Sequence, residues 1–467
     1  MSTVDTPHED YAIELPDWRK IEHITRLRML DSYLIELNPH DTSEENRARN
    51  RAYKQRAIFY AIAAQTVQGM LGTMFRRDPK LALPTVLKYM ERNADGAGVS
   101  LYQQSQGLCD DVIRKSRAGL YVSFPPTEGA VSMRDMVEGR YVATIQRLEP
   151  EQIINWRTET RGSQTRLKFV IIREYREKTD QYTTDEYMTL RELYLDDDGV
   201  YQERHWSDEG GALRVVDEIT PTDAAGQPWY EIPFIFVGAE NNDPKVDRPV
   251  MLPLVDLNIG HYRNSADWED SVWYVGQAQP WMSGVTESYL EMLKEQGMYV
   301  GSRNLLAVPE GGQFQFAAPP PNSIVRQAMQ DKVEMMLQLG ARLMQPGSAA
   351  RTATEVAGIR EAQHSILSLI AANASEAYTQ ALQWAGRYMG VGDGEMDAIS
   401  YQINQDFVSP DATPQDIQAM VAGFVQGSIP ISDYVRYMQR IGRFDGERTA
   451  EEYADMLETG GLPNAAG

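Results

Sequence analysis

Five residues that could bind a metal or exchange protons lie close together in the stretch DLNIGHYRNSADWEDSV, residues 256–272. They are four carboxylates and one imidazole: Asp256, His261, Asp267, Glu269 and Asp270. Carboxylate and imidazole groups are common metal ligands and general acids or bases. The stretch therefore predicts one of two things: a metal or acid–base site, or the charged face of a structural helix.

The spacing of the apolar residues in and beside this stretch favours the structural interpretation. They recur at intervals of four, three and four residues, as on one side of a helix: Val255, Ile259, Tyr262 and Ala266. Arg263 lies four residues before Asp267, a spacing that allows an ion pair, and Asp270 shares their face. His261 lies between the two faces. We expect a helix whose carboxylates are solvated and bind no metal.

Motifs that would support an enzyme are missing from the sequence. No two of the six histidines lie closer than fifteen residues, so there is no HExxH helix. No GxxxxGK[ST] or GxSxG motif is present, and DGAGVSL (95–101) stops short of GxGxxG. The single cysteine, Cys109, excludes an intrachain disulfide and a multi-cysteine zinc site. We expect no catalytic residue, metal or cofactor, although an enzyme with a scattered active site remains an alternative.

The charge balance bears on nucleic-acid binding. The chain has 467 residues, enough for two or three domains, with 67 acidic against 45 basic residues and a net charge of −22. Proteins that grip DNA phosphates concentrate Lys and Arg, so tight DNA binding is not expected. The acidic balance suits a surface that lets DNA pass, or simply keeps the chain soluble.

No secretory signal is visible at the N-terminus, and the single cysteine fits a reducing cytoplasm. The most apolar run, residues 57–75, contains Gln65, Thr66, Gln68 and Thr73. A bilayer core would penalise these groups, so this run predicts a buried helix and no membrane span.

Periodicity outlines an α+β fold that is mainly helical. Residues 17–75 and 84–118 are helical in pattern, and residues 141–244 are rich in β-branched and aromatic residues. Within them, Asp196-Asp197-Asp198-Gly199 predicts a hairpin turn and no calcium loop. Helices over 252–275 and 322–344, ~36 and ~34 Å long, bracket a mixed insert. They predict an antiparallel pair with a compact module at its tip.

Three further helical features are expected after residue 322. The second helix of the pair has one apolar stripe with spacings of four, three, four and three residues: Met329, Val333, Met336, Gly340 and Leu343. A long helix follows, with Thr352 or Thr354 as its N-cap. The tail from residue 405 predicts two helices and a last acidic helix over 447–458.

Five sequence blocks occur in a fixed order along the chain: NRAYKQRAIFYAIAAQTVQGMLGTMFRRDP (50–79), DGAGVSL (95–101), IPFIFVGA (232–239), LPLVDLNIGHYRNSADWEDSVWYVGQAQPWMSG (252–284) and ARTATEVAGIREAQHSILSLIAANASEAYTQALQWAGRYMG (350–390). With these blocks the chain resembles bacteriophage portal proteins. The resemblance extends over about residues 40–460, nearly the whole chain. Each block is weak alone, and their shared order makes the resemblance specific.

The resemblance implies a ring of subunits, expected to be twelve, at one vertex of the capsid, through which double-stranded DNA is packaged and ejected. It divides the chain into a portal fold: a wing (1–250), a first stem helix (251–275), a clip (276–321), a second stem helix (322–344), a channel loop (345–352), a long wing helix (353–390) and a crown (391–467). Such a ring would be part of the virion, assembled in the cytoplasm of a bacterial host.

The resemblance also implies site residues and partners. The channel loop would present Gln345, Pro346, Gly347, Ser348 and Arg351 to non-specifically bound DNA, with Arg342, Asp267 and Asp270 flanking the channel. The partners implied are the terminase large subunit, a head–tail adaptor, and the major capsid protein or scaffold. The alternative of another head–tail connector or adaptor ring stays open.

Overall fold

The computed structural model describes residues 3–125, 141–179, 182, 184–208, 213–223, 225–276, 279–296, 308–317, 323–344, 366–405, 414–426, 428–440, 449 and 451–453. The chain divides into two units, Met1–Ile403 and Asn404–Gly467. More residues belong to helices than to strands, so the expectation of a mainly helical α+β fold is confirmed.

A three-stranded sheet lies at the centre of the first unit. Its order is β3 (Thr144–Leu148), β2 (Arg117–Ser123) and β9 (Phe234–Gly238), with both pairings antiparallel. Helices α4 (Leu101–Lys115) and α10 (Ile366–Tyr388) contact these strands. The middle strand β2 is buried at six of its seven positions, which explains its nearly uninterrupted apolar and small residues. Alanines line the buried face of α10 and allow it to approach the sheet closely.

A second sheet is an antiparallel meander of five strands. Its members are β4 (Ile153–Arg161), β5 (Gln164–Thr179), β6 (Thr184–Leu195), β7 (Tyr201–Ser207) and β8 (Arg214–Ile219). The predicted turn at 196–199 joins β6 to β7: Gly199 has φ +82°, and Asp196 Oδ1 accepts the Val200 N–H at 2.8 Å. The acidic run therefore closes a hairpin, as its flanking strands predicted.

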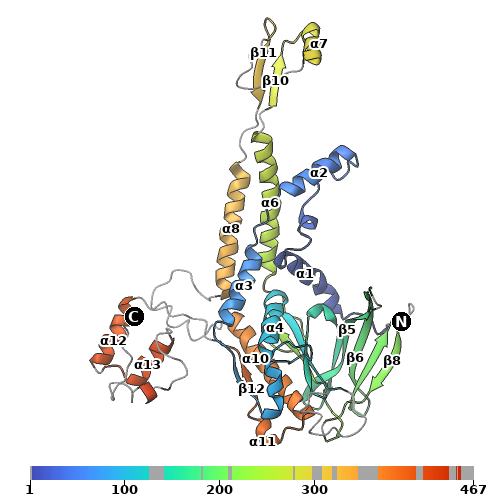
Figure 1. Ribbon diagram of the computed structural model, residues 1–467, viewed down its shortest axis with the longest axis vertical. Coiled ribbons are helices and arrows are strands. Elements are labelled where there is room, and N and C mark those ends of the chain that lie inside the picture. Colours follow the sequence, from blue (N-terminus) through green and yellow to red (C-terminus); the bar gives the residue numbers. More distant parts are fainter. Residues whose placement is uncertain are drawn as a thin grey trace. The chain divides into compact units, whose positions relative to one another are not determined.

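Two long helices form an antiparallel pair in the first unit. They are α6 (Leu252–Gly276) and α8 (Ser323–Met344), which run side by side (Figure 1). The chain between them holds the pair β10 (Gln279–Ser283) and β11 (Gln313–Ala317), together with α7 (Glu287–Gln296). We call residues 279–317 the tip module, because both of its ends connect to the same end of the helix pair. Both predicted helices and the mixed insert are confirmed.

The N-terminal residues expected to be helical form several pieces. These are α1 (Glu9–Thr25), η1 (Leu30–Tyr33), α2 (Glu44–Arg56) and α3 (Ile62–Met74). The apolar run 57–75 is thus a helix only from Ile62, and an extended segment precedes it. In the part of the chain that the structure describes, no helix is both long and apolar enough to cross a membrane.

Short elements complete the first unit. They are η2 (Thr85–Glu91), η3 (Pro150–Gln152), α11 (Asp393–Met396), and strand β1 (Lys80–Ala82) paired with β12 (Ser400–Gln402). Residues 391–403, expected to begin the crown, thus belong to the first unit. The helix expected from about residue 353 is described only as α10, so its candidate N-caps Thr352 and Thr354 lie outside the described residues.

The second unit contains the two helices expected in the tail, α12 (Pro414–Val425) and α13 (Ile431–Arg440). The Phe424 and Tyr434 rings stack with their centroids 4.4 Å apart, which joins the two helices. Most of the last expected helix, 447–458, lies outside the described residues.

Candidate functional site

An extended segment, residues 57–61, lies along the buried face of α6, and we call it the strap. Two α6 side chains bond the backbone of the strap and of the first turn of α3. Asn258 donates from Nδ2 to Tyr60 O at 2.8 Å and accepts from Ala63 N–H at 3.0 Å, and Ser265 Oγ accepts from Ile58 N–H at 3.1 Å. Asn258 and Ser265 are essentially inaccessible to solvent. Because buried backbone groups need partners, these two polar residues fix the path of the strap.

His261 lies between Asn258 and Ser265 on the same buried face, and it is only 1% exposed. Its ring packs against Tyr60 with the centroids 4.5 Å apart. Burial, and next the positive charge of Lys332, lowers the pKa of His261, so the imidazole is neutral at pH 7. Among the described residues, no group of three His, Cys, Asp or Glu side chains could hold a metal ion. The histidine of the opening stretch thus packs against the strap.

The carboxylates of α6 attach the N-terminal helices to it. Three of the four pair with a residue of α1 or α2: Asp256 Oδ1 with Lys20 Nζ at 3.1 Å, Asp267 Oδ1 with Tyr53 Oη at 2.7 Å, and Asp270 Oδ1 with Arg56 Nη2 at 2.5 Å. Arg56 also lies over the Trp273 ring, 4.6 Å from its centroid. Two candidate channel residues, Asp267 and Asp270, therefore hold α2 against α6.

Arg263 and Asp267, whose spacing allows an ion pair, each bind a different partner instead. Arg263 Nε donates to Tyr33 O at 2.9 Å, while Asp267 accepts from Tyr53. An exposed i,i+4 ion pair contributes only about 0.2–0.5 kcal/mol, so contacts with another segment readily replace it. The apolar side of α6 is as expected, with Val255, Ile259, Tyr262 and Ala266 all buried.

The other side of α6 packs against α8. Lys332 Nζ donates to Asn264 Oδ1 at 2.7 Å, and a Cβ on Gly260 would lie 3.3 Å from Lys332 Cε. Near the end of α8, a Cβ on Gly340 would lie 3.2 Å from Thr66 Oγ1 of α3. Gly260 and Gly340 therefore allow close helix contacts.

The candidate DNA-loop residues Gln345, Pro346, Gly347, Ser348 and Arg351 lie outside the described residues. Arg342 belongs to the last turn of α8, but its side chain lies outside the description as well. The predicted roles of these six residues therefore stay predictions.

The tip module leaves large apolar side chains in solvent. Trp281 on β10 is 40% exposed, Leu290 on α7 is 47% exposed, and Phe316 on β11 is 55% exposed. Strands β10 and β11 form a sheet of only two strands. Such a ribbon is marginally stable alone and gains stability from a further packing partner.

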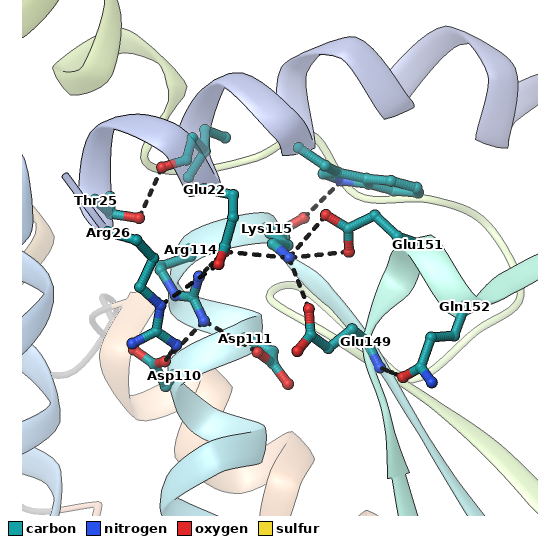
Figure 2. Close-up of polar contacts among 12 residues, drawn as sticks. Glu22, Thr25, Arg26, Asp110, Asp111, Arg114, Lys115, Glu149, Glu151 and Gln152 are labelled. Carbon is teal, nitrogen blue, oxygen red and sulfur yellow. Dashed lines mark hydrogen bonds and ion pairs between the residues drawn. The ribbon is translucent and has the colours of Figure 1, made fainter. Parts of the chain in front are cut away.

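A buried ionic cluster, which the sequence reasoning missed, joins α1, α4 and η3 (Figure 2). Lys115 is 0% exposed, and its Nζ lies 2.7 Å from Glu151 Oε1, 3.1 Å from Glu149 Oε2 and 3.4 Å from Glu22 Oε2. Burial would lower the pKa of Lys115, but the three glutamates raise it above its usual value. The lysine is thus held as a cation inside the protein.

Arg114 and Asp111 extend this cluster. Arg114 Nη2 pairs with Asp110 at 2.8 Å and with Asp111 at 3.2 Å, and its Nη1 pairs with Glu22. Asp111 is also 2.6 Å from Arg147 Nη1. Burial raises the pKa of Asp111 to about 7, although Arg147 and Arg114 oppose this. Since each charge faces an opposite one, the cluster is a structural joint between segments far apart in the sequence.

A cavity of about 310 Å³ lies between the three-stranded and the five-stranded sheets, lined in part by Arg191, Glu203 and His205. These groups are paired: Arg191 Nη1 lies 3.0 Å from Glu203 Oε1, which is 2.7 Å from His205 Nε2. Tyr121 Oη donates to Glu203 Oε2 at 2.8 Å. Arg191 Nε also lies 2.8 Å from Glu174 Oε1, so the cluster is a structural network of paired charges.

A model of a domain of unknown function, DUF4055, matches residues 250–389, which include α6, the tip module, α8 and α10. No curated protein matches the chain. Among solved structures, the chain is similar to a chain of "Neck of native GTA particle computed with C12 symmetry" at 13% identity and TM-score 0.40, covering 80% of this chain and 88% of that one. It is also similar to a chain of "Neck of empty GTA particle computed with C6 symmetry" at 13% identity and TM-score 0.38, covering 84% and 92%. TM-scores below 0.5 establish no shared fold, so a function must be argued from the chain's own residues.

Proposed function

We propose that the chain is the portal subunit of a tailed phage or phage-like particle. Its copies form a ring at one capsid vertex, expected to number twelve, and double-stranded DNA enters and leaves through the central channel. The protein is a passive conduit and docking platform, and a separate terminase motor supplies ATP hydrolysis.

One observation carries this proposal: the antiparallel pair α6–α8 with the tip module inserted between its helices. At 25 and 22 residues the helices are ~37 and ~33 Å long. Outward-facing apolar residues remain on α8 and on the tip module, among them Ile324 at 80% and Phe316 at 55% exposure. Subunits that pack side by side in a ring would cover such residues, whereas a monomer would leave them in water.

In this proposal the parts keep the roles that the sequence suggested. Helices α6 and α8 form the stem, the tip module forms the clip, and residues 1–250 with α10 form the wing. Residues 345–352 form the channel loop, and the second unit supplies most of the crown. The clip is proposed to meet the terminase large subunit and later the head–tail adaptor, while the wing meets the major capsid protein or scaffold.

The chain's charge suits this role. A net charge of −22 opposes tight binding of a polyanion, so DNA would slide instead of adhering. Arg342 and Arg351 are proposed to make weak phosphate contacts that are independent of base sequence. Asp267 and Asp270 are proposed to flank the channel while keeping α2 attached to α6.

Electron microscopy of the purified full-length chain tests the proposal. The expected result is a monodisperse ring with a central hole wide enough for duplex DNA. A compact monomer at every concentration tried would refute it. ATPase and nuclease assays on the same preparation provide a second test, since clear turnover by the pure chain would contradict a passive conduit.

A further inference from the structure

The solvent side of α8 carries a ridge of three exposed residues. Ile324, Asp331 and Met335 are seven and four residues apart, so they lie in one row along the helix. Ile324 is 80% exposed and Met335 is 54% exposed. We call these three residues the α8 ridge. Large apolar side chains repeated on one helix face are typical of a surface that another protein covers.

A second apolar surface lies beside the strap. Ile58 is 49% exposed, Tyr60 is 45% exposed and Trp273 is 44% exposed. Arg56, stacked on Trp273, links the aromatic ring to the strap. We call Ile58, Tyr60 and Trp273 the strap face. Helix α2, which precedes the strap, leaves α6 on the side away from α8 (Figure 1).

The two surfaces match in height along the helix pair. Lys332 of α8 reaches α6 at two points one helical turn apart: its Cε would lie 3.3 Å from a Cβ on Gly260, and its Nζ donates to Asn264 Oδ1. Because the helices are antiparallel, equal steps in opposite directions from Lys332 and from residues 260–264 reach the same height to within about one turn. Ile324, eight residues before Lys332, is therefore level with residues 268–272, which directly precede Trp273.

The same counting matches the other two members of the ridge. Asp331 is level with residues 261–265, which end at Ser265, the residue that binds the Ile58 backbone. Met335 is level with residues 257–261, which end at His261, the residue that packs against Tyr60. Each ridge residue therefore lies within about one helical turn of the height of a strap-face residue. A rotation axis parallel to the helices carries each residue to the same height on the next copy, so these residues could meet.

The charges around the two surfaces are opposite. Helix α2 has five basic residues against two acidic ones: Arg47, Arg49, Arg51, Lys54 and Arg56 against Glu44 and Glu45. Two of these bases, Lys54 and Arg56, are offset by Glu36 and Asp270 outside the helix, which leaves a smaller positive excess. The α8 ridge carries Asp331, and the exposed Glu334 lies beside it, while Lys332 between them donates to Asn264 of α6. A contact between two α8 ridges, or between two strap faces, would bring like charges together. A contact between the α8 ridge of one copy and the strap face of another joins opposite charges.

We propose that the α8 ridge of one copy packs against the strap face of the next copy. This inference rests on the proposed ring, and it names the two surfaces that close it. The contact is heterologous, so each copy uses its ridge on one side and its strap face on the other.

Two variants and their mixture test this assignment. Met335→Asp damages only the ridge, and Ile58→Asp damages only the strap face, whose neighbour would then be Asp331. Both side chains are about half exposed, so far-UV circular dichroism and the melting temperature should match those of the wild type. Val216→Asp, at a 60% exposed position on β8, is the matched control and should form the wild-type ring.

Mass photometry reads out the assembly. Each variant alone should stay at the monomer mass of 52.8 kDa, and the equimolar mixture should give a dimer of twice that mass and nothing larger. The dimer forms because one intact ridge meets one intact strap face, and the two damaged surfaces then stop growth. If either variant alone forms the wild-type ring, or if the mixture gives no dimer, the assignment of these two surfaces is wrong. Neither result would refute the proposed ring itself. Loss of the ring in Val216→Asp would also overturn it, and a wild-type chain that never forms a ring would refute the proposed function itself.

Discussion

Replacing Lys115 by Met should release α1 from the rest of the first unit. Met keeps most of the volume of the lysine stem but removes the cation that faces Glu22, Glu149 and Glu151. The backbone carbonyl of residue 115 still accepts from Trp18 Nε1 at 3.1 Å, so the substitution removes charge more than contact. Three carboxylates would then repel one another around an apolar side chain.

The size of the effect follows from the exposure of the partners. Removing one partner of a fully buried ion pair costs about 3–5 kcal/mol. Here the lysine is buried, but the Glu22, Glu149 and Glu151 side chains are 26%, 41% and 24% exposed, so water can solvate them in part. We therefore expect the free energy of local opening at α1 to fall by about 2–3 kcal/mol, which corresponds to an opening equilibrium constant about 30- to 150-fold larger.

Hydrogen exchange of peptides from α1, followed by mass spectrometry, measures this opening locally. At pH 7 the α1 amides of Lys115→Met should exchange about 30- to 150-fold faster than those of the wild type. Lys54→Met is the matched control, because Lys54 pairs with the 59% exposed Glu36 and its loss should cost less than about 1 kcal/mol. Exchange in Lys115→Met within threefold of the wild type would refute the reasoning.

The same comparison should depend on pH. Burial would raise the pKa of Glu22, but Lys115 and Arg114 leave it below its usual value. A carboxylate with a lowered pKa stabilises the folded state above its unfolded pKa, and this stabilisation is lost as the pH falls through the folded pKa. The difference between the wild type and Lys115→Met should therefore shrink below a pH of about 4.5. An undiminished difference at pH 3 would contradict the electrostatic explanation.

Three further substitutions probe other joints. Asn258→Ala should leave the Tyr60 carbonyl and the Ala63 N–H without partners and lower the free energy of unfolding by about 2–3 kcal/mol. The expected result is faster hydrogen exchange over residues 57–63, and unchanged exchange would contradict the role of Asn258. Arg117→Met removes the donors that bind the carbonyls of residues 243–245. Trypsin should then cut after Lys245 at least about tenfold faster than in the wild type. Equal cleavage rates would show that Arg117 does not hold this segment. Gly119→Ala would place a Cβ 2.8 Å from an Ile153 methyl and should cost about 1–3 kcal/mol by calorimetry, whereas Gly72→Ala on α3, with nothing within 4 Å, should not destabilise the protein.

The helix pair shows what local sequence patterns can predict. The expected helices 252–275 and 322–344 agree with α6 and α8 to within one residue at each end. The apolar stripe of α8 was also placed correctly, since Met336 and Gly340 are buried and Met329 and Val333 are partly buried. Helix periodicity is a property of neighbouring residues, so it is readable without knowledge of the fold.

The strap and the buried ionic cluster show where such patterns fail. Asn258 binds a backbone group 198 residues away, and Asp267 binds a hydroxyl 214 residues away. Lys115 and Asp111 look like solvated residues on a helix, and only their distant partners allow them to be buried. The strap itself has an apolar sequence that continues into α3, so periodicity alone extended the helix over it.

The path of the strap also affects the order of folding during synthesis. The backbone of Tyr60 obtains its partner Asn258 only 198 residues later. At about 5–20 residues per second, a ribosome needs about 10–40 s to make that stretch. During this interval the strap has no α6 to hold it, and neither the strap face nor the α8 ridge has been built. In the proposed ring, nascent chains on one messenger would therefore not join through these surfaces until most of the first unit has been translated.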